Sequence, residues 1–124
     1  MTPHPLPTAL LALLLATNLP AAPDDWPTWR GPDHTGHATA DQAPPTDFAS
    51  DRNALWVTPL PGKGHGSPIV AGERVFLATA DESTETQLLV CLDRKTGRQR
   101  WATPIHQGNF PKKINGKASH ASST

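Results

Sequence analysis

Short apolar runs separated by polar turns fill the chain between Trp56 and Trp101. Branched and aromatic residues, which favour extended backbone, are frequent in these runs. No apolar stripe at i, i+3 and i+4 continues through the intervening glycines and prolines, so helix is the weaker interpretation. We therefore predict four strands, at residues 67–71, 74–80, 87–93 and 98–105.

The second and third predicted strands, RVFLATA and QLLVCLD, are nearly continuous in apolar residues. A strand with one wet face alternates apolar and polar side chains, whereas a strand covered on both faces does not need to alternate. We therefore expect both faces of these two strands to be covered.

Two turns have residues suited to tight backbone reversals. Gly72 and Glu73 join the first two strands, and glycine adopts positive φ without steric cost. Before the fourth strand, the Asp93 and Thr96 side chains are suited to accept backbone N–H groups, and Gly97 is suited to the left-handed position. We therefore expect a hydrogen-bonded turn after Asp93.

An internal repeat is the clearest sign of organisation. WVTPL at residues 56–60 recurs as WATPI at residues 101–105, an offset of 45 residues. HGSP at residues 65–68 is more weakly matched by HASS at residues 120–123, at an offset of 55 residues. A period of roughly 40–50 residues suits one four-stranded blade of a β-propeller.

Residues 1–22 are expected to be a secretory signal peptide. Residues 5–22 carry no charge, and the apolar core ALLALLLA at residues 9–16 is far shorter than the roughly 20 residues of a transmembrane helix. The other interpretation is a buried helix of the folded domain. Export predicts a periplasmic or extracellular location with no stable membrane anchor.

Composition excludes several classes of protein. The chain has 11 Lys and Arg against 11 Asp and Glu, so nothing in its overall charge favours nucleic acid as a partner. Fourteen prolines and nine glycines disfavour a helical bundle. A single cysteine, Cys91, excludes an intrachain disulfide framework and any multi-cysteine metal site.

Several residues are candidates for chemistry, but none is assigned a catalytic, cofactor-binding or metal-binding role. Two loop histidines, His34 and His37, do not complete a zinc site, which needs three or four protein ligands. His65 and His120 occupy repeat-related positions, which favours a part in the architecture. Cys91 lies in an apolar strand, so we expect it to be a buried packing residue.

Other polar and aromatic groups have ordinary structural interpretations. Trp26 and Trp29 are expected to pack on the sheet as a lid, although with Arg30 they would also offer a stacking surface for a ligand. The three lysines of PKKINGK, at residues 111–117, are expected to lie in a solvated loop rather than to bind an anion.

CLDRKTGRQRW at residues 91–101 resembles A-x-D-x-x-T-G-x-x-x-W, the tryptophan-docking motif of pyrroloquinoline-quinone-like (PQQ-like) β-propeller repeats. Cys91 stands where that motif usually has alanine. DWPTWRGP at residues 25–32 is similar to the segment before the first blade in exported proteins of this group. The resemblance implies an all-β, quinoprotein-like propeller fold. It also implies that five residues dock the blade: Trp56, Asp93, Thr96, Gly97 and Trp101.

The resemblance divides the chain into a signal peptide (1–22), a lead-in (23–55), a first blade (56–105) and a loop into a second, truncated blade (106–124). Propellers of this group close with about seven or eight blades, so we interpret the chain as a fragment. A self-associating domain and another small β fold are the alternatives.

The function implied by the resemblance is that of an exported binding or scaffold module. Its partners would be the remaining blades of a longer chain, or other envelope proteins. The alternative is the N-terminal piece of a PQQ-dependent alcohol or sugar dehydrogenase, and only this alternative calls for PQQ and calcium.

Overall fold

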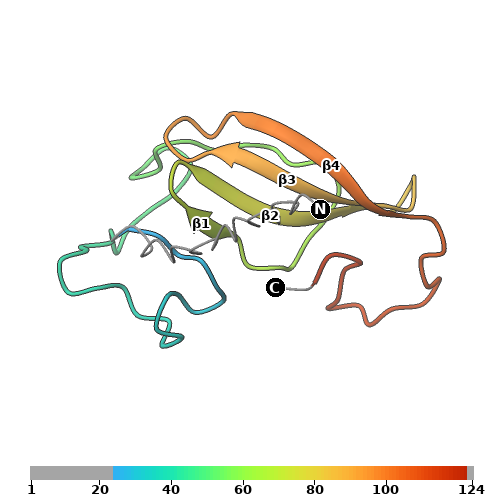
Figure 1. Ribbon diagram of the computed structural model, residues 1–124, viewed down its shortest axis with the longest axis horizontal. Helices are drawn as coiled ribbons and strands as arrows, with labels where there is room; N and C mark the ends of the chain where they lie inside the picture. The colour runs from blue at the N-terminus through green and yellow to red at the C-terminus, as the bar shows by residue number, and fades with distance from the viewer. Residues whose placement is uncertain (1–23, 123–124) are drawn as a thin grey trace, which may run out of the picture.

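The computed structural model describes residues 24–122, and these residues form one open antiparallel sheet of four strands without helices (Figure 1). The strands are β1 (Ile69–Ala71), β2 (Arg74–Asp81), β3 (Thr86–Asp93) and β4 (Gln99–Gln107). They lie side by side in chain order because short connections join antiparallel neighbours. The all-β prediction is therefore confirmed for the described residues.

All four predicted strands are present, with shifted ends. β1 starts two residues later than predicted, at Ile69, and follows Pro68, which has no N–H for a ladder. At the other end of the sheet the strands are longer than predicted, since Asp81 pairs with Thr86 and Thr86 pairs in turn with Gln107. The polar loop between β2 and β3 is correspondingly shorter.

The central strand β3 is buried on both faces. Cys91 pairs with Phe76 of β2 and Trp101 of β4, so these three residues share one face. The neighbouring Val90 points to the opposite face together with Leu77. Val90 and Cys91 are both 0% exposed, which confirms for β3 the expectation of cover on both faces, whereas in β2 only Thr79 and Ala80 are buried.

The segment before β1 lies along the outer edge of β2. Lys63 and Ala80 exchange two backbone hydrogen bonds, each of 2.8 Å. The hydroxyl of Thr79, which is 2% exposed, donates to the carbonyl of Pro61. These contacts extend the sheet beyond the short strand β1 and satisfy buried polar groups of β2.

The N-terminal end of the described chain is fastened to two turns of the sheet. Trp26 exchanges backbone hydrogen bonds of 2.9 and 2.8 Å with Val70 of β1. The carboxylate of Asp25 accepts the N–H of Gly72 at 2.8 Å and lies 3.7 Å from the Arg94 guanidinium. The lead-in is thereby held against the β1–β2 and β3–β4 turns.

The prediction that both lead-in tryptophans pack on the sheet is wrong for Trp29. Its side chain is 59% exposed, and the Arg30 guanidinium lies 5.5 Å from its ring. A tight turn, in which the N–H of Gly31 donates to the carbonyl of Thr28 at 3.0 Å, reverses the backbone immediately after Trp26. Trp26 stays beside β1, whereas Trp29 lies in the turn and faces solvent.

The predicted signal peptide, residues 1–22, lies outside the described residues. Between residues 24 and 122, no helix has the length and apolar character needed to cross a bilayer.

Candidate functional site

The β3–β4 turn is organised by the carboxylate of Asp93. Its Oδ1 accepts the backbone N–H and the hydroxyl of Thr96, both at 2.8 Å, and the N–H of Lys95 at 3.1 Å. Its Oδ2 accepts a hydrogen bond of 2.6 Å from Arg100. The Thr96 hydroxyl, followed by Arg100 and the Thr96 N–H, lowers the pKa of Asp93 from 3.8 to about 2. The side chain is therefore ionised at neutral pH.

Gly97 completes this turn with φ of 70°, as predicted. The indole of Trp56 lies directly against it: a Cβ at position 97 would stand 2.5 Å from the ring. The Trp56 Nε1–H donates to the carbonyl of Arg94 at 2.9 Å, and the Thr58 hydroxyl donates to the carbonyl of Gly97 at 2.7 Å. Four of the five predicted docking residues therefore meet at one turn, with Trp56 held by packing and a hydrogen bond.

The fifth predicted docking residue, Trp101, lies apart from that turn on a sheet face. Its ring centroid is 6.0 Å from that of Phe76, and the rings are tilted by 52°. Cys91 stands between them in the register. A small side chain at position 91 leaves room for the two aromatic rings to approach each other. Trp101 remains 39% exposed, so its ring offers apolar surface for a further contact.

The two repeat-related segments HGSP and HASS meet in space. The backbone N–H groups of His65 and Gly66 both donate to the carbonyl of Ala121, at 3.0 and 3.2 Å. Ala121 is 3% exposed, and the side-chain amide of Gln87 donates to the carbonyl of His120. The repeat pattern relates these segments in sequence, but no local signal indicates that they touch.

His120 anchors the segment that follows β4. Its ring stacks on Phe110 with centroids 4.2 Å apart, and its Nε2 lies 3.2 Å from the carbonyl of Pro111. Its Nδ1 is 3.8 Å from a carboxylate oxygen of Glu82. Each contact holds this segment in place, which agrees with an architectural role. Sequence reasoning missed Phe110 and Glu82 because neither belongs to the repeat pattern.

Comparison with protein-family models, with curated proteins and with solved structures finds no match for this chain. The family resemblance therefore rests on the motif residues themselves.

The remaining candidates lie apart from one another. His34 and His37 are exposed in the lead-in, as expected of solvated loop residues. The Cys91 thiol is free and buried, which confirms its interpretation as a packing residue. The lysines of residues 111–117 are exposed, again as expected.

In the part of the chain that the structure describes, no three His, Cys, Asp or Glu side chains gather closely enough to hold a metal ion. Calcium, which only the dehydrogenase alternative calls for, prefers six to eight oxygen ligands, and the carboxylates of residues 24–122 do not gather in threes. The β3–β4 turn is held by hydrogen bonds and by the packing of Trp56, and the Trp101 face offers apolar surface.

Proposed function

We propose that this chain is a repeat-bearing segment of an exported, PQQ-like β-propeller protein, and that it acts as a binding or scaffold module. Residues 56–105 would form the first blade, after the lead-in of residues 23–55, and residues 106–124 would lead into a second. No catalysis is assigned to this segment.

The observation that carries the proposal is the contact between repeat-related segments. In a propeller, the innermost strands of successive blades lie next to one another around a common axis. The HGSP segment precedes β1, the strand closest to the N-terminal lead-in, and its backbone binds the HASS segment through Ala121. Strands β1, β2 and β3 lie between the two tryptophans that stand 45 residues apart, and the second of them, Trp101, belongs to β4.

The Trp101 face supports the same proposal. An open four-stranded sheet with an exposed aromatic ring on one face gains stability when a further layer covers that face. In the proposed protein, an adjoining blade supplies this layer. Its partners are therefore, first, the remaining blades of a longer chain and, second, other envelope proteins.

The experiment compares Trp101→Ala with Trp29→Ala, both measured by urea denaturation. In a longer gene product that contains further repeats, Trp101→Ala is expected to lower the free energy of unfolding by about 3–5 kcal/mol, as for truncation of a fully buried large side chain. In the 124-residue chain, where Trp101 is 39% exposed, the same substitution should lower the free energy of unfolding by clearly less. Trp29→Ala is the matched control and should change stability by less than about 0.5 kcal/mol, since its side chain is largely exposed.

Equal costs of Trp101→Ala in the two proteins would refute the proposal that an adjoining blade covers this face.

A further inference from the structure

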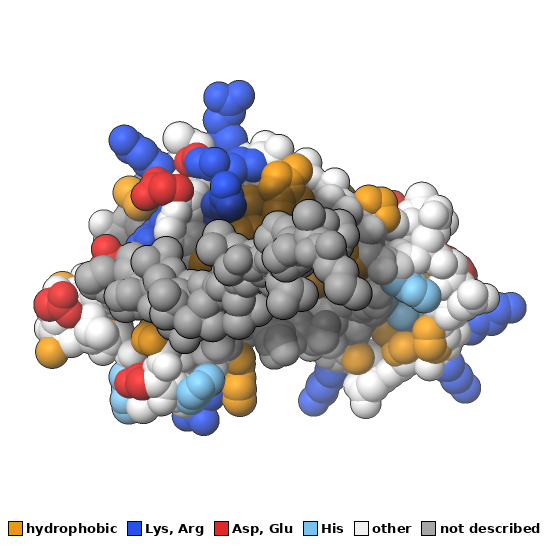
Figure 2. Space-filling model, viewed as in Figure 1, with side chains coloured by type: hydrophobic (Ala, Val, Ile, Leu, Met, Phe, Trp, Pro, Cys, Tyr) orange, Lys and Arg blue, Asp and Glu red, His pale blue; other side chains and the backbone are white. Residues whose placement is uncertain are grey.

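Positively charged side chains gather where β4 begins. Residues 94–100, RKTGRQR, contain four cations and no acid, although the whole chain has no net charge. The sheet adds Arg74 to this cluster, since Arg74 pairs with Asp93 at the end of β3. On the face shown in Figure 2, Lys and Arg side chains gather over the β3–β4 turn and the start of β4.

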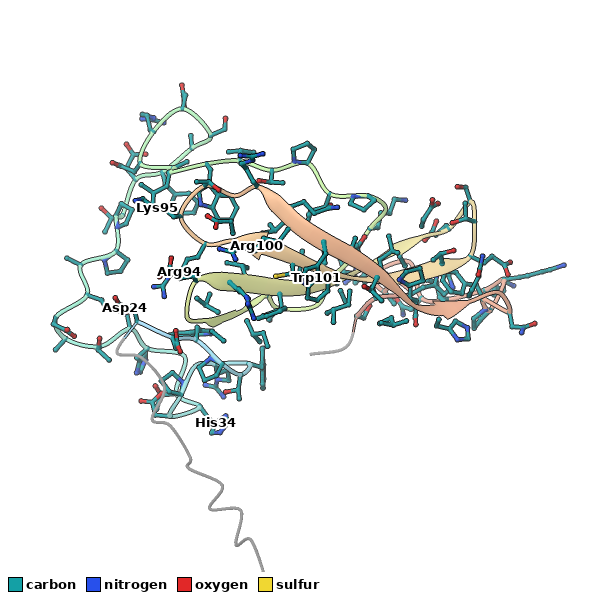
Figure 3. All side chains as sticks on the ribbon, turned by 45° about the horizontal axis from the view of Figure 1, so that its top comes forward. Asp24, His34, Arg94, Lys95, Arg100 and Trp101 are labelled. Carbon is teal, nitrogen blue, oxygen red and sulfur yellow. The ribbon has the colours of Figure 1, made fainter. Side chains whose placement is uncertain are left out.

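Two adjoining hollows run through this cluster. The first, of about 440 Å³, is lined by Arg74 and Arg100 together with the β1–β2 turn. The second, of about 310 Å³, is lined by Arg98 and Arg100 together with Asp93, Thr96 and Gln99. Arg100 borders both hollows, and Figure 3 shows it on β4 next to Trp101, with Arg94 and Lys95 at the adjacent turn. The hollows therefore form one cationic surface beside the first half of β4.

Part of this positive charge is not neutralised. Arg100 binds Asp93, and Arg94 lies near Asp25. By contrast, the exposed side chains of Arg74, Lys95 and Arg98 make no hydrogen bond or ion pair with another residue between positions 24 and 122. Glu73 also lines the first hollow and offsets one of these charges. A local surplus of cations remains, and it is largely arginine.

The same region has a free strand edge. β4 is the last strand in the sheet order, so within the described residues its outer edge has no neighbouring strand. Pro104 has no N–H, which confines backbone pairing along this edge mainly to Gln99–Thr103. That stretch contains Arg100 and begins directly after Arg98. Burial of the sheet faces by other layers would leave this edge accessible.

We propose that the outer edge of β4 binds an extended, acidic peptide segment of a partner protein by strand addition. Backbone hydrogen bonds to Gln99–Thr103 would supply affinity, as in other cases where a peptide adds a strand to a sheet. Carboxylates of the added segment would meet Arg98 and Arg74, whose planar guanidinium groups match carboxylates in a bidentate way. The inference rests on the proposed binding-module function and deepens it by naming the partner's chemistry.

The probe is a fluorescein-labelled, end-capped peptide of nine residues in which Glu alternates with Val or Thr, and binding to the 124-residue chain is measured by fluorescence anisotropy. We expect saturable binding that weakens as salt rises. The double variant Arg74→Glu with Arg98→Glu should weaken it tenfold or more. The control Lys113→Glu with Lys117→Glu makes the same charge change on another exposed loop and should alter binding less than twofold.

A second probe separates strand addition from simple attraction to a polyanion. The same peptide with N-methyl groups on alternate residues keeps its charge but loses half of its backbone donors, so it should bind at least tenfold more weakly. Equal binding of the methylated peptide would overturn the proposal in favour of a patch for any polyanion. Equal losses in the two double variants, or no binding of the probe at all, would also overturn it.

Circular dichroism checks that each variant folds. If a double variant does not fold, the single variant Arg98→Gln takes its place, and its peptide binding is measured over the same range of salt concentrations. Since Trp101 lies on a sheet face and is unchanged in these variants, failure of this test leaves the test of the adjoining blade unaffected.

Discussion

Replacing Gly97 by alanine tests whether Trp56 is held on the β3–β4 turn. The backbone at Gly97 has φ of 70°, and a left-handed L-residue costs about 1–2 kcal/mol. The new Cβ would also stand 2.5 Å from the Trp56 ring and 2.7 Å from the Thr58 hydroxyl oxygen. Relieving such an overlap costs typically about 1–3 kcal/mol. We therefore expect Gly97→Ala to destabilise the protein by about 2–5 kcal/mol.

The matched control is Gly72→Ala in the β1–β2 turn. Gly72 has φ of 53°, but a Cβ there meets nothing within 4 Å. Only the backbone cost of about 1–2 kcal/mol applies. The difference between the two variants therefore isolates the packing of Trp56 from the cost of the left-handed backbone.

Urea denaturation followed by far-ultraviolet circular dichroism measures both variants. Gly97→Ala should be less stable than Gly72→Ala by about 1–3 kcal/mol, the overlap cost alone. In a thermal scan, 1 kcal/mol corresponds to a shift of about 4–8 °C for a domain of this size. Equal losses in the two variants would refute the packing of Trp56 on Gly97.

Two further predictions concern single side chains. Because the pKa of Asp93 is lowered from 3.8 to about 2, its ionised form stabilises the fold above about pH 4, and this contribution is lost as the pH falls toward 2. The urea midpoints of wild type and Asp93→Asn should therefore converge over that window, and a constant gap would show that the charge of Asp93 does not matter. Thr79→Val removes the buried hydroxyl that donates to the carbonyl of Pro61 and should cost about 0.5–1.5 kcal/mol in the same assay, the net contribution of a typical intramolecular hydrogen bond. The exposed Thr103→Val serves as its control, and equal losses would contradict this role of Thr79.

The strands and turns followed from the sequence because their signals are local. The apolar run of β3 predicted burial on both faces, and Val90 and Cys91 show it. The turn after Asp93 was equally readable, since its acceptor and its glycine stand four residues apart. The predicted strand ends were less accurate, because a strand continues only as far as its neighbour offers residues to pair with, as Thr86 does for Asp81.

Contacts between distant segments were not readable. Trp56 was expected to dock, but its place on Gly97, 41 residues later, depends on its hydrogen bond to the carbonyl of Arg94 in the distant β3–β4 turn. Likewise the run of cations from residue 94 to 100 is visible in the sequence, whereas the addition of Arg74 requires the β2–β3 register.

That this sheet is one repeat among several is tested most directly by reading the coding DNA beyond the codon for Thr124. We predict an open frame that encodes further D-x-x-T-G-x-x-x-W motifs at intervals near the 45 residues that separate the first two tryptophan segments. A stop codon at that point, or a long open frame without such motifs, would contradict the proposal.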